Sequence, residues 1–309
     1  MEEALVSIVI PTCKRPWEYL CRAVESVLAQ TYKRVEVIIV DDSPDTYEHR
    51  REVQQNMADL CSRDDRVRYL VNEKNLGGSM ARNRGIEAAA GVYTTFLDDD
   101  DEYLPEKVEH QVAFMQETGC DLSFGDMIMY NQKDEVVDVR RYEDIEAFDN
   151  ETLLRYHLTR QMTGTPTFMF KTEKLRQIGG FDNAKMGQEF YLMLKAIEAG
   201  LTVRHLPRCD IKVYKHQSGS ISSGKNKING EKDLYAFKHR YFDKLTRRDR
   251  MFVRFRHYAV MVVAYLRNRN IFAAIGAAFA AFFSSPLDFF GQVFGFLGRV
   301  KKANKTKAD

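Results

Sequence analysis

The chain has 309 residues and a formal net charge of +2, and 44% of its residues are hydrophobic, which is enough for a sizeable core. This length exceeds one typical domain but is short for three, so we expect one large α/β domain with an appendage. Positions 247–309 hold twelve Lys or Arg against three Asp, a net charge of +9, and so leave −7 for the rest of the chain. An acidic body with a basic tail favours an anionic surface as partner, either a membrane or a nucleic acid.

The cysteines exclude a disulfide framework. They are five in number, widely spaced and without a Cys-x-x-Cys pair, which is typical of reduced thiols in a cytosolic protein. Residues 1–5 begin acidic and lead straight into a predicted strand, without the basic and apolar regions of a signal peptide. We therefore expect a cytoplasmic protein.

The first hundred residues alternate between apolar runs, typical of strands buried on both faces, and segments with helical spacing. The predicted strands are 6–10, 35–40, 67–71 and 93–97, and the predicted helices are 18–29 and 80–90. A polar stretch with helical spacing follows the second strand. The resulting βαβαβαβ order implies a parallel sheet with right-handed crossovers.

Residues 105–214 follow a more mixed pattern and predict a smaller half that completes the sheet. The predicted elements are a helix at 106–117, a strand beginning at 121, an apolar run at 165–170 and a helix at 190–199. Gln188 and Glu189 open the last helix, where the helix dipole favours a carboxylate.

The final segment differs in kind. Residues 271–283 carry no charge, but these thirteen residues are fewer than the roughly 20 needed to span hydrocarbon. A second apolar stretch, 287–297, follows Ser284-Ser285-Pro286, and arginines and lysines flank the pair. We expect an amphipathic, interfacial or re-entrant appendage at an anionic membrane. A helical pair docked on the body or buried in a dimer is the alternative.

Polar residues gather where predicted strands end, at Pro11-Thr12, Asp41-Asp42 and Asp98 to Asp101. Ligands of parallel α/β sheets bind at the carboxyl ends of strands. Four consecutive carboxylates repel one another unless a cation lies among them. Hard oxygen ligands select Mg²⁺ or Mn²⁺, which proteins usually share with substrate phosphates. The sequence therefore predicts a divalent metal, a phosphate-bearing substrate and a nucleotide-binding first half.

Taken together, the motifs closely resemble the inverting family 2 glycosyltransferases with a GT-A fold, which is Rossmann-like, with a mainly parallel sheet flanked by helices. The resemblance covers about residues 5–220, with five motifs in the family's order and spacing. They are Val6 to Thr12, Ile39 to Asp42, Asn75 to Ile86, Phe96 to Asp101 and Gly179 to Asp182. A single Asp-x-Asp is a weak signal, but five ordered motifs are a strong one.

The resemblance implies a nucleotide pocket. Pro11, Thr12 and Asp42 would line the base site, where a carboxylate accepts the N3–H of uracil, and this favours a UDP-sugar. Arg82 would brace the nucleotide. The sequence departs from the family at Ser43-Pro44-Asp45, where a Gly-Ser-Thr type of turn is usual, so the shape of this loop is open.

The resemblance also implies a metal site. Asp98 or Asp99 would hold the ribose, and the roles of these two could exchange because the four-acid run blurs the register. Asp100 would ligate Mn²⁺ or Mg²⁺ bound to the diphosphate. His216 lies where some family members place a further metal or diphosphate ligand, although a lone histidine can equally be structural.

Glu189 matches the position of the family's general base, within a motif usually written Gln-Asp-Trp and here Gln188-Glu189-Phe190. The implied reaction is a single in-line displacement. Glu189 deprotonates the acceptor hydroxyl, the hydroxyl attacks the anomeric carbon opposite UDP, and the configuration inverts. If Glu189 is not the base, Asp182 is the next candidate.

The resemblance implies that the protein transfers a hexose or N-acetylhexosamine from a UDP-sugar to a hydroxyl of a lipid-linked saccharide, in exopolysaccharide, capsule or cell-wall glycan synthesis. The expected organisation is a nucleotide-sugar half at 1–105, an acceptor half at 106–220 and a helical region at 221–309. We expect a peripheral protein on the inner face of the cell membrane, with no nucleic acid partner and with homo-oligomers possible.

Alternatives remain. A polyprenyl phosphate could be the acceptor, or the body could be a non-catalytic nucleotide-sugar-binding module anchored at the membrane. A sugar-1-phosphate nucleotidyltransferase normally has a glycine-rich loop after its first strand, which residues 11–16 lack. A haloacid-type phosphatase has Thr or Val after Asp-x-Asp, whereas Asp101 and Glu102 follow here.

Overall fold

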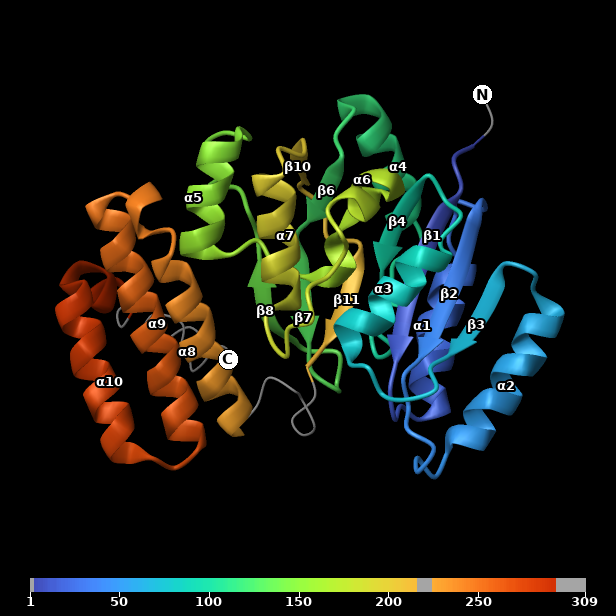
Figure 1. Ribbon diagram of the computed structural model, residues 1–309, viewed down its shortest axis with the longest axis horizontal. Coiled ribbons are helices and arrows are strands. Elements are labelled where there is room, and N and C mark those ends of the chain that lie inside the picture. Colours follow the sequence, from blue (N-terminus) through green and yellow to red (C-terminus); the bar gives the residue numbers. More distant parts are fainter. Residues whose placement is uncertain (1–2, 216–223, 293–309) are drawn as a thin grey trace, which may run out of the picture. The chain divides into compact units, whose positions relative to one another are not determined.

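The computed structural model describes residues 3–215 and 224–292, which form two compact units (Figure 1). The first unit comprises residues 3–157 and 161–215. The second comprises residues 158–160 and 224–292.

A seven-stranded sheet of order β10-β6-β9-β4-β1-β2-β3 forms the centre of the first unit (Figure 1). Its strands are β1 (Val6–Thr12), β2 (Val35–Asp41), β3 (Val67–Val71), β4 (Tyr93–Phe96), β6 (Leu122–Gly125), β9 (Met169–Lys171) and β10 (Val203–Leu206). β9 runs antiparallel to β4 and β6, whereas the other neighbouring pairs are parallel. The predicted mainly parallel sheet is confirmed.

Helices cover both faces of this sheet, because alternate side chains of a strand point to opposite faces. Ile8 and Ile10 of β1 pack in one core with residues of three helices, and Val9 packs in another core with residues of four others. The first three helices are α1 (Trp17–Leu28), α2 (Arg50–Arg63) and α4 (Lys107–Thr118). The other four are α3 (Gly78–Ala88), α5 (Asn150–Arg160), α6 (Thr172–Gln177) and α7 (Gln188–Glu198). This two-sided burial is why the strands read as uninterrupted apolar runs.

A second, four-stranded sheet of order β5-β11-β7-β8 was not predicted from the sequence. Its strands are β5 (Glu102–Tyr103), β11 (Ile211–Tyr214), β7 (Met127–Tyr130) and β8 (Val136–Arg140). These strands are two to five residues long and partly polar, so they carry no periodic signal. β5 begins directly after the four aspartates, and this position ties the second sheet to the acidic run.

Gly85 allows α3 to lie close to β1. A Cβ atom on Gly85 would come within 2.3 Å of Cγ1 and 2.9 Å of Cγ2 of Val9. Valine is stiff about χ1, so it cannot turn both methyl groups away. The close approach fixes α3 against the central strand, and α3 carries Arg82 in its second turn.

The second unit is helical. After α5 (Asn150–Arg160), which enters it with its last three residues, it contains α8 (Gly224–His239), a 3₁₀ turn (Phe242–Lys244), α9 (Arg247–Arg267) and α10 (Ile271–Ser284). Thr246 and Asp249 form a capping box at the start of α9, and the Asn270 side chain accepts a hydrogen bond from the Ala273 N–H at the start of α10. α9 packs against both α8 and α10.

Within the described residues, no single helix has the length and apolar composition needed to cross a membrane. One helix pair, Ile271–Ser284 with Pro286–Gln292, meets that test jointly, but it is bent by 119° at the break between its two parts. The predicted apolar stretch 287–297 is described as far as Gln292. Phe294, Phe296 and the basic residues from Arg299 onward lie outside the described residues.

We expect Gly85→Ala to lower the thermal unfolding temperature, because its methyl group would overlap the Val9 side chain. Overpacking of this kind typically costs about 1–3 kcal/mol. Gly276→Ala is the matched control, since a Cβ on this α10 glycine meets nothing within 4 Å and alanine favours helices. Differential scanning calorimetry should show a clear loss for Gly85→Ala and no loss for Gly276→Ala; equal effects would contradict the close approach of α3.

Candidate active site

The carboxyl ends of three neighbouring strands bring the predicted polar motifs to one edge of the sheet. β1 lies between β2 and β4 and is parallel to both. β1 continues two residues past its predicted end, so that Thr12 pairs in register with Asp41. The aspartate run begins two residues after β4 ends at Phe96.

Asp99 is buried and is held from the loop after β1. The Thr12 hydroxyl donates a hydrogen bond of 2.8 Å to Oδ2 of Asp99, and Nε of Arg15 donates one of 2.9 Å to Oδ1. Arg15 also lies 2.9 Å from Oδ2 of Asp100 through Nη2. Burial raises the pKa of Asp99 to about 6, and the charge of Asp100 adds to this, while Arg15 opposes it. A guanidinium group therefore bridges two of the four acids.

Arg82 joins the acidic run to the first turn of α7. Its Nη2 donates to Oδ1 of Asp98 at 2.5 Å, and its Nη1 donates to Oε1 of Gln188 at 2.8 Å. The guanidinium lies 5.5 Å from the centre of the Phe181 ring. Gly78 leaves room for this pair, since a Cβ there would come within 3.2 Å of Nη1 of Arg82. One side chain thus contacts both the strand-end acids and the helix that carries Glu189.

Glu189 occupies the second position of α7 and is partly exposed. Its carboxylate makes no hydrogen bond or ion pair with the residues that the structure describes. Asp182, the other candidate base, differs, because its Oδ1 lies 2.8 Å from Nζ of Lys195. Among the described residues, the carboxylate of Glu189 is therefore unpaired, whereas that of Asp182 pairs with Lys195.

Asp42 is buried and holds the loop that leads into α3. Its Oδ1 accepts hydrogen bonds from Nδ2 of Asn72 at 2.7 Å and from the N–H of Leu76 at 2.8 Å. Its Oδ2 accepts from the N–H of Gly77 at 2.7 Å. Asn75 also bonds to the Asp42 backbone carbonyl at 2.7 Å. The sequence did not predict this structural task for Asp42. Three donors use three of the roughly four lone-pair directions of a carboxylate, which leaves one for a ligand.

Asp101 is buried and binds the second sheet. Its Oδ1 accepts the N–H of Tyr214 at 2.8 Å. Burial raises the pKa of Asp101 well above its usual value, and the charges of Asp98 and Asp100 add to the effect. Hence the four consecutive acids take different tasks, and Asp101 attaches β11 to the end of β4.

Arginines from three elements offset the acidic run, and sequence reasoning missed two of them. Besides Arg15 and Arg82, Arg22 of α1 donates to the carbonyl of Asp100 at 2.9 Å and lies 3.0 Å from Oε1 of Glu102. The sequence argument named a metal as the counter-ion of these acids, whereas the fold also supplies cations of its own. The sequence did hold a clue, because Arg15 and Arg22 come soon after the strand that ends at Thr12. The direction in which their side chains point could not be predicted from it.

The acidic run fits a divalent cation that a substrate shares. Among residues 3–215 and 224–292, no three His, Cys, Asp or Glu side chains converge as a ready metal site. Mg²⁺ and Mn²⁺ need only one or two carboxylates when phosphates supply the other oxygens. The side chains of Asp98 and Asp100, 37% and 17% exposed, offer such oxygens. His216 lies outside the described residues, so its role as a ligand stays a prediction.

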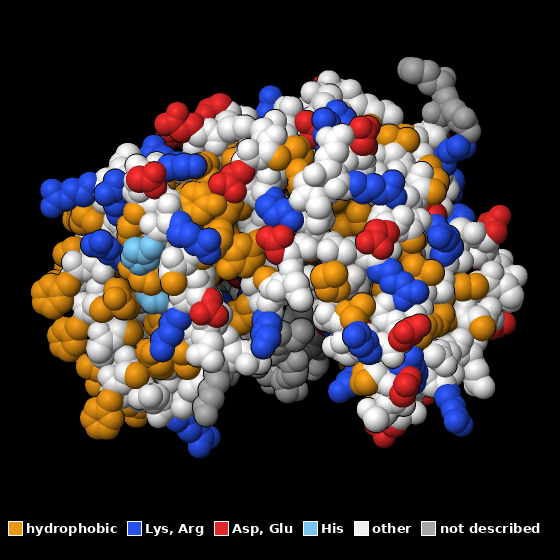
Figure 2. Space-filling view, in the orientation of Figure 1, with side chains coloured by type: hydrophobic (Ala, Val, Ile, Leu, Met, Phe, Trp, Pro, Cys, Tyr) orange, Lys and Arg blue, Asp and Glu red, His pale blue; other side chains and the backbone are white. Residues whose placement is uncertain are grey.

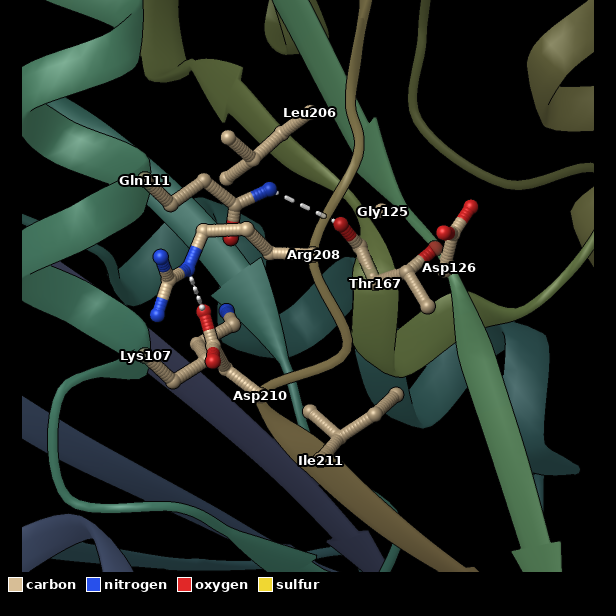
Figure 3. A pocket seen from close by; sticks show the side chains of 9 residues that line it. All are labelled: Lys107, Gln111, Gly125, Asp126, Thr167, Leu206, Arg208, Asp210 and Ile211. Carbon is tan, nitrogen blue, oxygen red and sulfur yellow. Dashed lines mark hydrogen bonds and ion pairs between the residues drawn. The ribbon is translucent and has the colours of Figure 1, made fainter. Parts of the chain in front are cut away.

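The small cavity of Figure 3 is not a sugar site. It lies among Lys107, Gln111, Gly125, Asp126, Thr167, Leu206, Arg208, Asp210 and Ile211. Its volume of about 20 Å³ suits one water molecule, not a hexose. Gln111 closes one side by donating to the Thr167 carbonyl at 2.8 Å, and Arg208 pairs with Asp210 at 3.3 Å (Figure 3).

The sequence and the fold both match known proteins. The profile of the family described as "Glycosyl transferase family 2" matches residues 7–179. The chain is 30% identical over 223 residues to the putative teichuronic acid biosynthesis glycosyltransferase TuaG of Bacillus subtilis, covering 72% of this chain and 82% of TuaG. It is 26% identical over 198 residues to an uncharacterized glycosyltransferase of Methanocaldococcus jannaschii, covering 64% of this chain and 66% of that protein.

Crystal structures of S. aureus TarS share the fold. The structure of TarS residues 1–349 in complex with UDP-GlcNAc superimposes with a TM-score of 0.59 and covers 90% of this chain and 91% of that one. The sequence identity is 16%, so this likeness concerns the fold. A further structure contains the same TarS residues with UDP, at a TM-score of 0.54.

We expect Asp42→Asn to destabilise the protein by about 1–3 kcal/mol. Three N–H groups now donate to the Asp42 carboxylate, and the NH₂ group of asparagine would face at least one of them without an acceptor. Asp45→Asn, in the same loop, is the matched control: its side chain is 86% exposed and pairs with Arg50. Surface changes of that kind usually stay within about 0.5 kcal/mol. Urea unfolding of both variants measures the difference; equal stability of Asp42→Asn and the parent would contradict the assigned bonds.

Proposed function

The chain belongs to glycosyl transferase family 2 and is a glycosyltransferase with a GT-A fold, and from this premise we propose an inverting, metal-dependent transfer. The donor is a UDP-hexose or UDP-N-acetylhexosamine, and the acceptor is a hydroxyl of a lipid-linked saccharide. The pair of hydrogen bonds by which Arg82 joins Asp98 to Gln188 carries this proposal. Through these two bonds, Arg82 brings the strand-end acids and the carboxylate of Glu189, the residue after Gln188, into one site.

The nucleotide would bind across the ends of β1 and β2. Pro11 and Thr12 line this edge, and the remaining lone pair of Asp42 can accept the N3–H of uracil. The complexes of TarS with UDP-GlcNAc and UDP support a uridine nucleotide as donor. Asp98 or Asp99 would hold the ribose. Because Asp99 already bonds Thr12 and Arg15 while Asp98 is more exposed, Asp98 is the more accessible of the two.

Asp100 would hold Mn²⁺ or Mg²⁺, with the diphosphate oxygens as further ligands. A bound divalent ion would neutralise the charge that develops on the departing diphosphate. The residues of the chain do the rest of the positioning. Arg15 and Arg82 orient the carboxylates of Asp98, Asp99 and Asp100, so that little reorganisation is needed when the donor binds.

Glu189 would act as general base. An acceptor hydroxyl within hydrogen-bond reach loses its proton to the carboxylate, and its oxygen attacks the anomeric carbon on the face opposite UDP. The C1–O bond to UDP breaks as the new C1–O bond forms, the diphosphate leaves with the electron pair, and the configuration inverts. The ion pair of Asp182 with Lys195 supports Glu189 over Asp182 in this role.

The acceptor is assigned by analogy. The name of TuaG links a relative to the biosynthesis of teichuronic acid, which supports a role in cell-wall or extracellular polysaccharide synthesis. A lipid-linked saccharide suits a cytoplasmic enzyme that works at the inner face of the cell membrane. A polyprenyl phosphate acceptor is the second candidate.

We expect Glu189→Gln to lower kcat by about 100-fold or more, because the amide keeps the shape of the side chain but cannot accept the proton. The affinity for the UDP-sugar should stay unchanged. Glu198→Gln is the matched control, since it makes the same change at the exposed far end of α7. Release of UDP is measured in the presence of acceptor for both variants. Turnover of Glu189→Gln within a few-fold of the parent would contradict the role of Glu189 as general base. Asp182→Asn would then be the next variant to measure.

We expect Asp100→Ala to abolish most of the gain in UDP affinity that Mn²⁺ produces, with the fold intact. Isothermal calorimetry with and without Mn²⁺ measures that gain, and circular dichroism checks the fold. Asp65→Ala removes an exposed carboxylate elsewhere in the same unit and should change nothing. A Mn²⁺-dependent gain equal to that of the parent would exclude Asp100 as the main ligand.

A further inference from the structure

The helix α10 directs its small side chains inward and its large ones outward. Ala274, Ala277 and Ala281 are buried, and they recur at the helical spacing that makes one face. Phe272 and Phe283 on the other face are 89% and 76% exposed. A helix is usually stabilised by burying its large apolar side chains. Here the face that packs internally is the alanine face, which has less apolar surface to bury than the phenylalanine face. The outer face therefore has no role within the second unit.

The outer face continues beyond the C-terminal end of α10. It consists of Phe272, Ile275, Phe279, Phe283 and Leu287, each at least 50% exposed, and we call it the α10 face. Figure 2 shows orange side chains standing along the surface that α10 occupies in Figure 1. Single exposed apolar residues are ordinary, but a contiguous row of this size marks an interaction surface.

Exposed arginines border the α10 face at the corner between α9 and α10. Arg267 ends α9, and Arg269 lies in the turn beside Ile271. Both are exposed, and neither forms an ion pair with the described residues. Val263 and Leu266, 48% and 54% exposed, add apolar surface at the same corner. Apolar side chains with cations at their edge are the composition of a segment that lies in a lipid interface.

The negative charge of this region is already neutralised. Between positions 250 and 292 the sequence holds five arginines and one acid, Asp288. Arg248 donates to both carboxylate oxygens of Asp288 at 2.6 Å, and Ser285 donates to Oδ2 at 2.5 Å. The one acid of this stretch is therefore paired, whereas Arg267 and Arg269 at the edge of the α10 face form no ion pair with the described residues.

We propose that the α10 face docks on an anionic lipid bilayer and lies in its headgroup region without crossing it. The phenylalanines would enter the acyl boundary, and Arg267 and Arg269 would bind acidic headgroups. The 119° bend between Ile271–Ser284 and Pro286–Gln292 suits a segment that stays in one leaflet. A second copy of the chain fits less well, because it would bring the same uncompensated arginines to the interface and no acid to pair with them.

The test uses the full chain and two kinds of liposome, phosphatidylcholine alone and phosphatidylcholine with 30% phosphatidylglycerol, in a flotation assay. The parent protein should float with the anionic vesicles and far less with the neutral ones, and 0.5 M NaCl should reduce the binding. No sugar donor or acceptor is present. The result is therefore independent of the proposed transfer reaction.

The apolar part is tested by a triple variant, Phe272→Ser with Phe279→Ser and Phe283→Ser. It should lose binding to anionic vesicles and keep its unfolding temperature, because these side chains pack little within the unit. The matched control replaces three exposed valines of β8 in the first unit, Val136, Val137 and Val139, by serine. This control should float as the parent does.

The charged part is tested by Arg267→Gln with Arg269→Gln. Each arginine near an acidic leaflet contributes a roughly fivefold gain in affinity, so the pair should lower binding about thirtyfold at low salt. Arg63→Gln with Arg141→Gln, two exposed arginines of the first unit, is the control. Equal binding of the parent to neutral and anionic vesicles, or no binding to either, would overturn the proposal. So would a dimer in analytical ultracentrifugation that the phenylalanine variant converts to a monomer.

Discussion

Four consecutive carboxylates at the end of a buried strand are the constraint on which the first unit depends. Two of them, Asp99 and Asp101, are buried, and a buried charge is costly unless it is paired or hydrogen-bonded. Arg15 from the loop after β1 pairs with Asp99, and the N–H of Tyr214 bonds to Asp101. Arg22 from α1 and Arg82 from α3 hold the carbonyl of Asp100 and the carboxylate of Asp98. One short segment is therefore tied to three elements, and Asp98 and Asp100 remain the more exposed acids.

The same network connects the acidic run to the start of the helix that carries Glu189, the proposed base. Arg82 uses one nitrogen for Asp98 and another for Gln188, so the position of the acidic run is coupled to the start of α7. Gly85 permits this, because only a residue without a side chain lets α3 approach Val9 and carry Arg82 to the strand ends. The proposed in-line displacement needs the base and the leaving group on opposite sides of one carbon, and a link between their supports would maintain that geometry.

The second unit follows a different logic. Its helices α9 and α10 are capped, yet α10 exposes Phe272, Phe279 and Phe283 and buries Ala274, Ala277 and Ala281. Such a helix is stable through its contact with α9 and retains an apolar face for an outside partner. The charge asymmetry predicted from the sequence has a local cause here. Arg248 neutralises Asp288, and Arg267 and Arg269 form no ion pair with the described residues.

The sequence by itself determined the family, the parallel sheet and the segments that meet at its edge. Buried strands have an apolar pattern that leaves little choice of structure, and the carboxyl ends of neighbouring parallel strands necessarily share one side. It did not reveal the second sheet, whose short strands carry no period, or the partners of Arg15, Arg22 and Gln188. Ion pairs and hydrogen bonds between residues far apart in the chain depend on where loops turn after the sheet has formed. The bonds of Asp42 to Asn72, Leu76 and Gly77 are of this kind, and only the tertiary structure decided them.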